Sequence, residues 1–223
     1  MKYGKTDSTS SPLVVVELNQ GESIKLEPGA MVYHNGKVSL EGKMNGGFGG
    51  ALMKKKFTNE SFFITTATGT ENGGKIGIAP AGFGDIHEIQ VGPTQWLLND
   101  GAYLASDATV DYKSKSQGIG KAMFGKTGGF FIIQTSGQGS MLVNAFGTLM
   151  QFELNGTEDL VIDNGHVVCW EDTLDYKIEV ASGTFGFTTG EGLVCRFKGS
   201  GKVILQTRNI ENFAGILAGF LAK

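Results

Sequence analysis

Apolar residues along the chain gather in short runs that are rich in β-branched and aromatic side chains and that end at Gly, Asn, Asp or Ser. Such runs predict β-strands joined by tight turns. The pattern therefore predicts an all-β fold. The clearest runs are LVVVEL (13–18), FFITTAT (62–68), KIGIAP (75–80), GFFIIQTS (129–136), SMLVNAF (140–146), GLVCRF (192–197) and KVILQT (202–207).

Two departures from this strand pattern are informative. The Asn-Gly pair in HNGK (34–37) predicts a type I′ hairpin turn. Apolar residues recur at steps of three and four only near the end, which predicts a short amphipathic helix over 210–223. We expect its apolar face to pack against the β-body or a neighbouring subunit, with anchoring at a membrane surface as the alternative. The residues of this face are Phe213, Ile216, Leu217 and Phe220.

The chain repeats itself. The segment LNDGAYLASDATVDYK (98–113) matches IDNGHVVCWEDTLDYK (162–177), and a weaker copy lies at 18–38. We predict a single domain, 1–223, built from three consecutive units at about 12–75, 76–140 and 141–209. All three units share a glycine, which predicts a positive φ or a close backbone approach at that position. These turn glycines are Gly29, Gly101 and Gly165.

Composition narrows the function classes. The formal charge of -3 lacks the basic footprint of a nucleic-acid binder, so nucleic acid is not an expected partner. Glycine supplies 35 of the 223 residues, which fits many tight turns. The two cysteines lie in apolar runs, and neither a signal peptide nor a run of 18 apolar residues is evident. We expect a cytoplasmic protein, with a peripheral membrane location left open.

The histidine and cysteine of IDNGHVVCWEDTLDYKIE (162–179) suggest a nucleophile with its base. His166 and Cys169 are three residues apart, however, which places them on opposite faces of a strand. A metal site of cupin type would need His34, His87 and His166, which occupy positions that do not correspond between the units. We therefore predict no catalytic, cofactor-binding or metal-binding residue and no cofactor, and keep the three histidines as weak metal candidates.

Two glycine-bearing insertions, 42–56 and 113–129, occupy equivalent places in the first and second units. The first contains NGGFGGALMKKK, whose glycines and lysines suggest a phosphate cradle. It lacks G-x-x-x-x-G-K-[ST] and a following helix pattern. We interpret it as a hairpin tip or an interface loop, and its role stays open.

With these repeats, the order GE-x4-EPGAMV, NGG, ESFF, GAYLAS, IDNGHVVCWED and GEGLVCRFKGSGKVILQTRN resembles bacterial members of the altered-inheritance-of-mitochondria family. The resemblance implies three consecutive short double-stranded β-helix units, similar to the tryptophan RNA-binding attenuator protein, in one β-sandwich-like body. It also implies a homotrimer whose nine units form a ring. It brings no catalytic residues, and a shared fold does not transmit RNA binding.

These observations predict a non-enzymatic β-scaffold or interaction protein that self-assembles, with exposed strand edges covered by neighbouring copies. Its partners are other copies of the chain, and further a protein partner or a membrane surface. Two alternatives remain. One is a cupin-like enzyme that binds a small ligand or a metal, and the other is a protein held at a membrane surface by its C-terminal helix.

Overall fold

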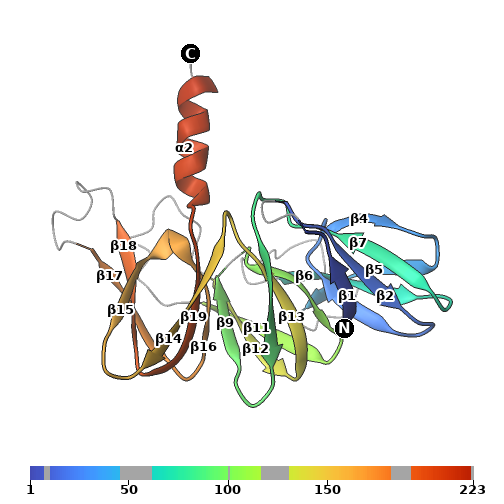
Figure 1. Cartoon of the computed structure of the whole chain (residues 1–223), viewed down its shortest axis with the longest axis horizontal. Helices are drawn as coiled ribbons and strands as arrows, with labels where there is room; N and C mark the ends of the chain where they lie inside the picture. The colour runs from blue at the N-terminus through green and yellow to red at the C-terminus, as the bar shows by residue number, and fades with distance from the viewer. Residues whose placement is uncertain (8–10, 46–61, 100, 117–130, 182–191, 222–223) are drawn as a thin grey trace, which may run out of the picture.

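The computed structural model describes residues 1–7, 11–45, 62–99, 101–116, 131–181 and 192–221. Strands dominate, and they are followed by α2 (Ile210–Leu221), so the predicted all-β class with a short C-terminal helix is confirmed. The sheets follow one another along the long axis, and α2 projects from one side of the body (Figure 1). Within these described ranges, a short strand, β1 (Lys2–Lys5), precedes three sets of six strands.

The three sets follow the chain in order. The first comprises β2 (Val14–Leu18), β3 (Ser23–Leu26), β4 (Met31–His34), β5 (Val38–Asn45), β6 (Phe62–Gly69) and β7 (Gly74–Ile78). The second comprises β8 (Ile86–Val91), β9 (Trp96–Asn99), β10 (Tyr103–Asp107), β11 (Val110–Ser116), β12 (Phe131–Gly137) and β13 (Gly139–Asn144). The third comprises β14 (Leu149–Asn155), β15 (Leu160–Asp163), β16 (Val167–Glu171), β17 (Asp175–Val180), β18 (Leu193–Lys198) and β19 (Ser200–Gln206), with the 3-10 turn η1 (Asn164–His166) before β16.

Each set has the same antiparallel pairing. The sixth strand lies between the first and the third, and the fifth lies between the fourth and the second. Each set therefore consists of two three-stranded halves. The unit ends predicted at about 75 and 140 fall inside β7 and β13. The predicted ends rest on matching turn motifs along the chain. No similar sequence motif marks the residue at which a strand ends.

Backbone pairing also joins one set to the next. The second strand of each set pairs with the third strand of the following set, as β3 does with β10 and β9 with β16. These pairings fuse half-sets into two six-stranded sheets, ordered β5-β6-β3-β10-β13-β8 and β11-β12-β9-β16-β19-β14. The terminal half-sets form a four-stranded sheet, β1-β2-β7-β4, and a three-stranded sheet, β15-β18-β17.

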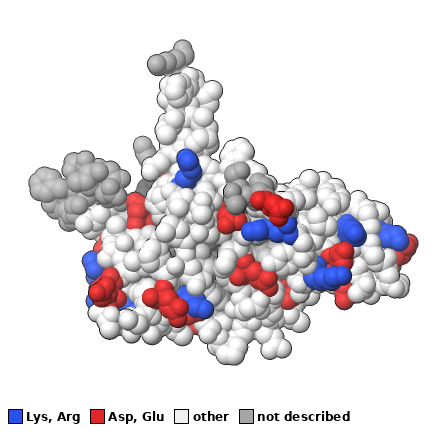
Figure 2. Space-filling view, viewed as in Figure 1, with Lys and Arg blue, Asp and Glu red and all other residues white. Residues whose placement is uncertain are grey.

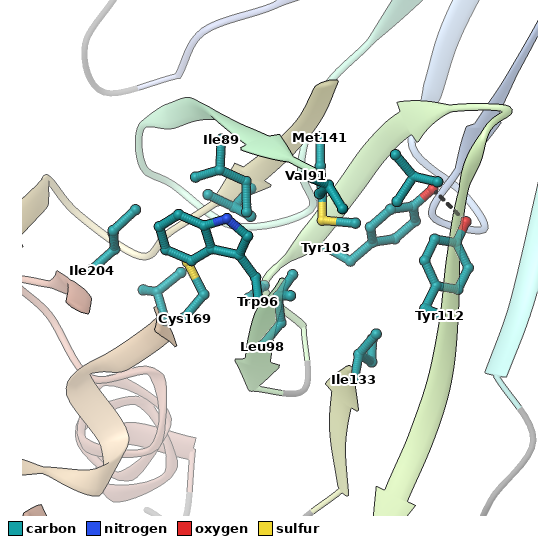
Figure 3. Packing of buried hydrophobic residues seen from close by; sticks show 14 of the residues in the cluster. Ile89, Val91, Trp96, Leu98, Tyr103, Tyr112, Ile133, Met141, Cys169 and Ile204 are labelled. Carbon is teal, nitrogen blue, oxygen red and sulfur yellow. Dashed lines mark hydrogen bonds between the residues drawn. The ribbon is translucent and has the colours of Figure 1, made fainter. Parts of the chain in front are cut away.

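Three hydrophobic cores separate the four sheets. The six-stranded sheets contribute to a core on each face, as β13 shows by placing Met141 in the middle core and Leu142 in the first. The third core lies between the second six-stranded sheet and the three-stranded sheet, and it is centred on Trp170 and Phe197. Figure 3 shows the middle core, where the hydroxyl groups of Tyr103 and Tyr112 lie 3.0 Å apart.

The turn between β4 and β5 differs from the prediction. Gly36 has a positive φ of 84°, but no residue other than glycine has a positive φ in the described ranges, so the predicted type I′ turn is wrong. The Asn35 side chain explains the difference, because it accepts hydrogen bonds from the backbone N–H groups of Lys37 and Lys75 and donates one to the carbonyl of Gly73. These bonds hold Asn35 in an ordinary backbone conformation.

The shared turn glycines meet two different backbone requirements. Gly29 and Gly101 adopt positive φ values of 85° and 78°, with open space where a side chain would stand. Gly165 has no such φ; a Cβ there would collide with the amide nitrogen of the Asn209 side chain. The first two glycines are thus required by conformation, and the third is required by close approach.

Replacing Gly101 by alanine should lower the free energy of unfolding by about 1–2 kcal/mol, because the added Cβ opposes the left-handed conformation without any steric clash. Gly92→Ala is the matched control, since Gly92 also faces open space but lacks a positive φ. Urea denaturation at one protein concentration measures both. Equal destabilisation by the two changes would contradict the conformational explanation.

Candidate interaction surfaces

The β4 edge, Met31–His34, is an open edge at one end of the stack. Its four residues are all exposed, whereas the first four residues of β10 and of β16, the third strands of the other sets, are buried. The reason is pairing. Both β10 and β16 lie between two strands, whereas β4 pairs only with β7 among the described residues. The apolar strand β4 therefore lies at a sheet edge, whereas the equivalent strands β10 and β16 are central.

Burial at equivalent positions makes the contrast clear. Each third strand has a bulge after its first residue, so Val32 corresponds to Leu104 in β10 and Val168 in β16. Val32 is 58% exposed, while Leu104 and Val168 are 0% and 2% exposed. An apolar patch of this kind on an edge strand is typical of an interaction surface.

The β15 edge, Leu160–Asp163, is an open edge at the other end of the stack. It is the second strand of its set, and within the part of the chain that the structure describes it pairs only with β18. Val161 is 44% exposed, and Phe152 on the nearby strand β14 is 37% exposed. The charged groups behind this edge are already paired, since Arg196 of β18 contacts Glu179 at 2.7 Å and Asp159 at 3.5 Å.

The helix α2 forms a third exposed surface. It has no buried residue, and apart from Glu211 and Asn212 it consists of apolar residues and glycine. Asn209 caps its start, because the Asn209 side-chain oxygen accepts a hydrogen bond from the backbone N–H of Glu211 at 2.8 Å. Most of the helix shows as uncharged surface in Figure 2.

The helix contacts the body near its first turn. The Phe213 ring packs on the Phe146 ring with centroids 5.4 Å apart. The rest of the predicted apolar face stays largely exposed in the described part of the chain, with Ile216, Leu217 and Phe220 at 62%, 46% and 74%. The axis of α2 leads away from the described sheets, which explains the high exposure of these side chains (Figure 1).

The histidines singled out from the sequence lie on separate elements. His34 ends β4, where its Nδ1 accepts a hydrogen bond from the backbone N–H of Gly36. His87 is exposed on β8, and His166 in η1 places its Nδ1 2.8 Å from the carbonyl oxygen of Gln206. Within the described ranges, no group of three or more His, Cys, Asp or Glu residues is arranged to hold a metal ion.

The two cysteines are buried and unpaired with each other. Burial raises the pKa of the Cys169 thiol, which belongs to the middle core. Burial and then the nearby Asp163 carboxylate raise the pKa of the Cys195 thiol to about 12. The Cys195 thiol donates a hydrogen bond to the Asn164 side chain at 3.1 Å. Such environments disfavour the thiolate that a nucleophile requires.

The structure describes only part of the two glycine-bearing insertions. The Gly/Lys-rich insertion at 42–56 lies mostly outside the described residues, and so does the insertion at 113–129. In the described segments, no helix is long and apolar enough to cross a membrane.

Sequence reasoning alone does not identify the β4 and β15 edges as interaction surfaces. The one sequence feature that points to the β4 edge is the apolar run Met31–Tyr33, whose equivalents in the other sets are buried.

The fold and these surfaces define an all-β protein of stacked sheets with open edges at both ends. The chain belongs to the mitochondrial biogenesis AIM24 family, whose model matches residues 3–208. It is 41% identical to the uncharacterized protein M6_Spy0233 of Streptococcus pyogenes serotype M6, over 99% of this chain and 91% of that protein. The crystal structure of protein SPYM3_0169 from Streptococcus pyogenes superposes with a TM-score of 0.83 at 38% identity, covering 98% of this chain and 99% of that one.

Neither cysteine should react with a disulfide reagent such as dithiobis(nitrobenzoate) within minutes at pH 8 in the folded protein. Burial raises both thiol pKa values further above pH 8, so very little thiolate forms at that pH, and burial also blocks access of the reagent. Both thiols should react at once in guanidinium. Phe83→Cys, at a site that is 67% exposed, is the reactive control. Rapid modification of Cys169 in the folded chain would instead support a nucleophilic role.

Proposed function

We propose that this protein is a non-enzymatic scaffold that assembles head to tail, with the β15 edge of one copy beside the β4 edge of the next. One observation carries the proposal. The three-stranded sheet corresponds to one half of a six-stranded sheet, and the strands β4, β7 and β2 correspond to the other half. Placed side by side, they give the order β17-β18-β15-β4-β7-β2, which repeats the order of both complete sheets.

Head-to-tail contacts of this kind use two different surfaces, so they form either a closed ring or an open filament. We propose the ring of three chains and nine units that the family resemblance implies. The identical strand pairing of the three sets supports their interpretation as consecutive repeats, similar to units of the tryptophan RNA-binding attenuator protein. The unpaired, buried Cys169 and Cys195 support a reducing, cytoplasmic setting.

Light scattering should give a mass of about three chains of 23.7 kDa each at micromolar concentration. Val32→Asp should reduce it to the mass of one chain, because the carboxylate would lie where the equivalent Leu104 and Val168 are buried. Val32 is exposed within a single copy, so the monomer should stay folded by circular dichroism.

Phe83→Asp supplies the matched control, since Phe83 is 67% exposed, somewhat more than Val32, but lies outside both edge strands. It should keep the mass of three chains. A monomeric unchanged protein, or a Val32→Asp variant with the full mass, would reject head-to-tail assembly through β4.

The exposed helix α2 favours a second function, attachment to a membrane surface. A helix of twelve residues is about 18 Å long and apolar on nearly all sides, which suits insertion into one leaflet but not crossing. Beyond the first turn, its large side chains are 46–87% exposed among the residues that the structure describes. This attachment is compatible with a ring, because α2 belongs to neither edge.

Vesicle flotation tests this attachment. The full chain should float with phosphatidylcholine–phosphatidylglycerol vesicles, and a chain that ends at Asn209 should not. Ile216→Glu should greatly reduce the floated fraction, because it places a charge on the apolar surface, whereas Asn212→Glu adds the same charge at an already polar site and should float normally. Equal flotation of the full and shortened chains would exclude a role for α2.

A further inference from the structure

The junctions within the chain fix the geometry of a junction between copies, if the proposed head-to-tail assembly holds. At the first junction Ala105 of β10 lies opposite Leu26 of β3, and at the second Cys169 of β16 lies opposite Leu98 of β9. Neighbouring pairs continue in step, because Ser106 faces Lys25 just as Trp170 faces Leu97. Both junctions therefore use one register.

The open edges carry the residues that correspond to these pairs. On the third strand, the residue after the bulge is Tyr33 in β4, and it faces Gly77 just as Ala105 and Cys169 face the equivalent positions of β13 and β19. On the second strand, Ile162 of β15 corresponds to Leu26 and Leu98, since each precedes its own third-strand residue by seven positions. The separation is the same in all three sets, so no slip is needed to align them.

We propose that the β15 edge of one copy pairs antiparallel with the β4 edge of the next in this single register. Ile162 then faces Tyr33, Val161 faces His34 and Leu160 faces Asn35. A slip by one residue would turn every side chain to the opposite face and would expose the apolar residues of both edges.

Side-chain volumes at the junctions support this register. The pair that faces the preceding core is Ala105 with Leu142 at the first junction and Cys169 with Ile204 at the second, so a small residue on the third strand meets a large one on the sixth. In β4 the sizes are reversed. The Tyr33 ring lies over Gly77, where a Cβ would collide with it, and so fills the place that Leu142 and Ile204 occupy elsewhere.

A partly exposed apolar residue lies at the other end of the stack. Phe152 of β14 corresponds to Ile89 of β8, because they face the equivalent residues Val203 and Met141. Ile89 is 3% exposed and shares the middle core with Ile204. Phe152 is 37% exposed. In the proposed register the Tyr33 ring of the next copy takes the place of Ile204 and covers Phe152, which completes the third core.

Disulfide trapping tests the register. A chain with both His34→Cys and Val161→Cys places two thiols directly opposite each other, about 4.5–5.5 Å apart at Cβ, close enough to link after a small adjustment. Mild oxidation should give covalent dimers and trimers on a denaturing, non-reducing gel. Both positions are exposed in one copy, so the fold should tolerate the changes.

The control pair is His34→Cys with Asp159→Cys, which lies two residues out of register, about 7–8 Å apart, and should stay as single chains. Each single variant should also stay uncrosslinked. Links in a single variant would indicate like-with-like edge pairing and would overturn the proposal. Equal linking of the control pair, or no link in a protein that still has the mass of three chains, would reject the register and leave the assembly intact. A monomeric mass would reject the assembly itself.

Discussion

Backbone pairing between consecutive sets is the interaction on which the rest of this structure depends. The hydrogen bonds of β3 with β10 and of β9 with β16 turn half-sets into six-stranded sheets. Among the described residues, only these sheets contribute to a hydrophobic core on each face. A buried strand must satisfy its N–H and C=O groups on both sides, so a third strand needs a second strand from the preceding set. This pairing therefore explains why the cores are stacked and why the stack ends at the open edges of β4 and β15.

Burial on both faces also determines which residue types occur along the central strands. They lose the alternation of apolar and polar residues that marks a sheet with one wet face, and the polar groups that remain must find partners inside. Tyr103, Tyr112 and Ser106 do so through their hydroxyl groups, at 3.0 Å and 3.3 Å. Thr135 likewise accepts from the backbone N–H of Trp96 and donates to Gln95. These contacts let polar side chains occupy an otherwise apolar interior.

The parts of the fold that sequence could predict are the local ones. Apolar runs located β2, β6, β7, β12, β13, β18 and β19, because strand formation follows short patterns. The exposure of β4 was not predictable in this way, since the apolar pattern of Met31–His34 resembles that of its buried counterparts. The difference lies in pairing, because no second strand lies beside β4 in the described residues. Gly165 was recognisable as special, but its reason, Asn209, lies far along the chain. The turn at Asn35 likewise depends on contacts with β7.

The position of α2 has a consequence for any closed assembly. Copies related by one rotation axis present each feature on the same side, so every α2 in a ring leaves from one face. A twelve-residue apolar helix binds weakly by itself, but several helices on one rigid platform act at a high effective concentration. Attachment through α2 would thus be switched by assembly: weak for a free chain and strong for the ring, with no change in the helix.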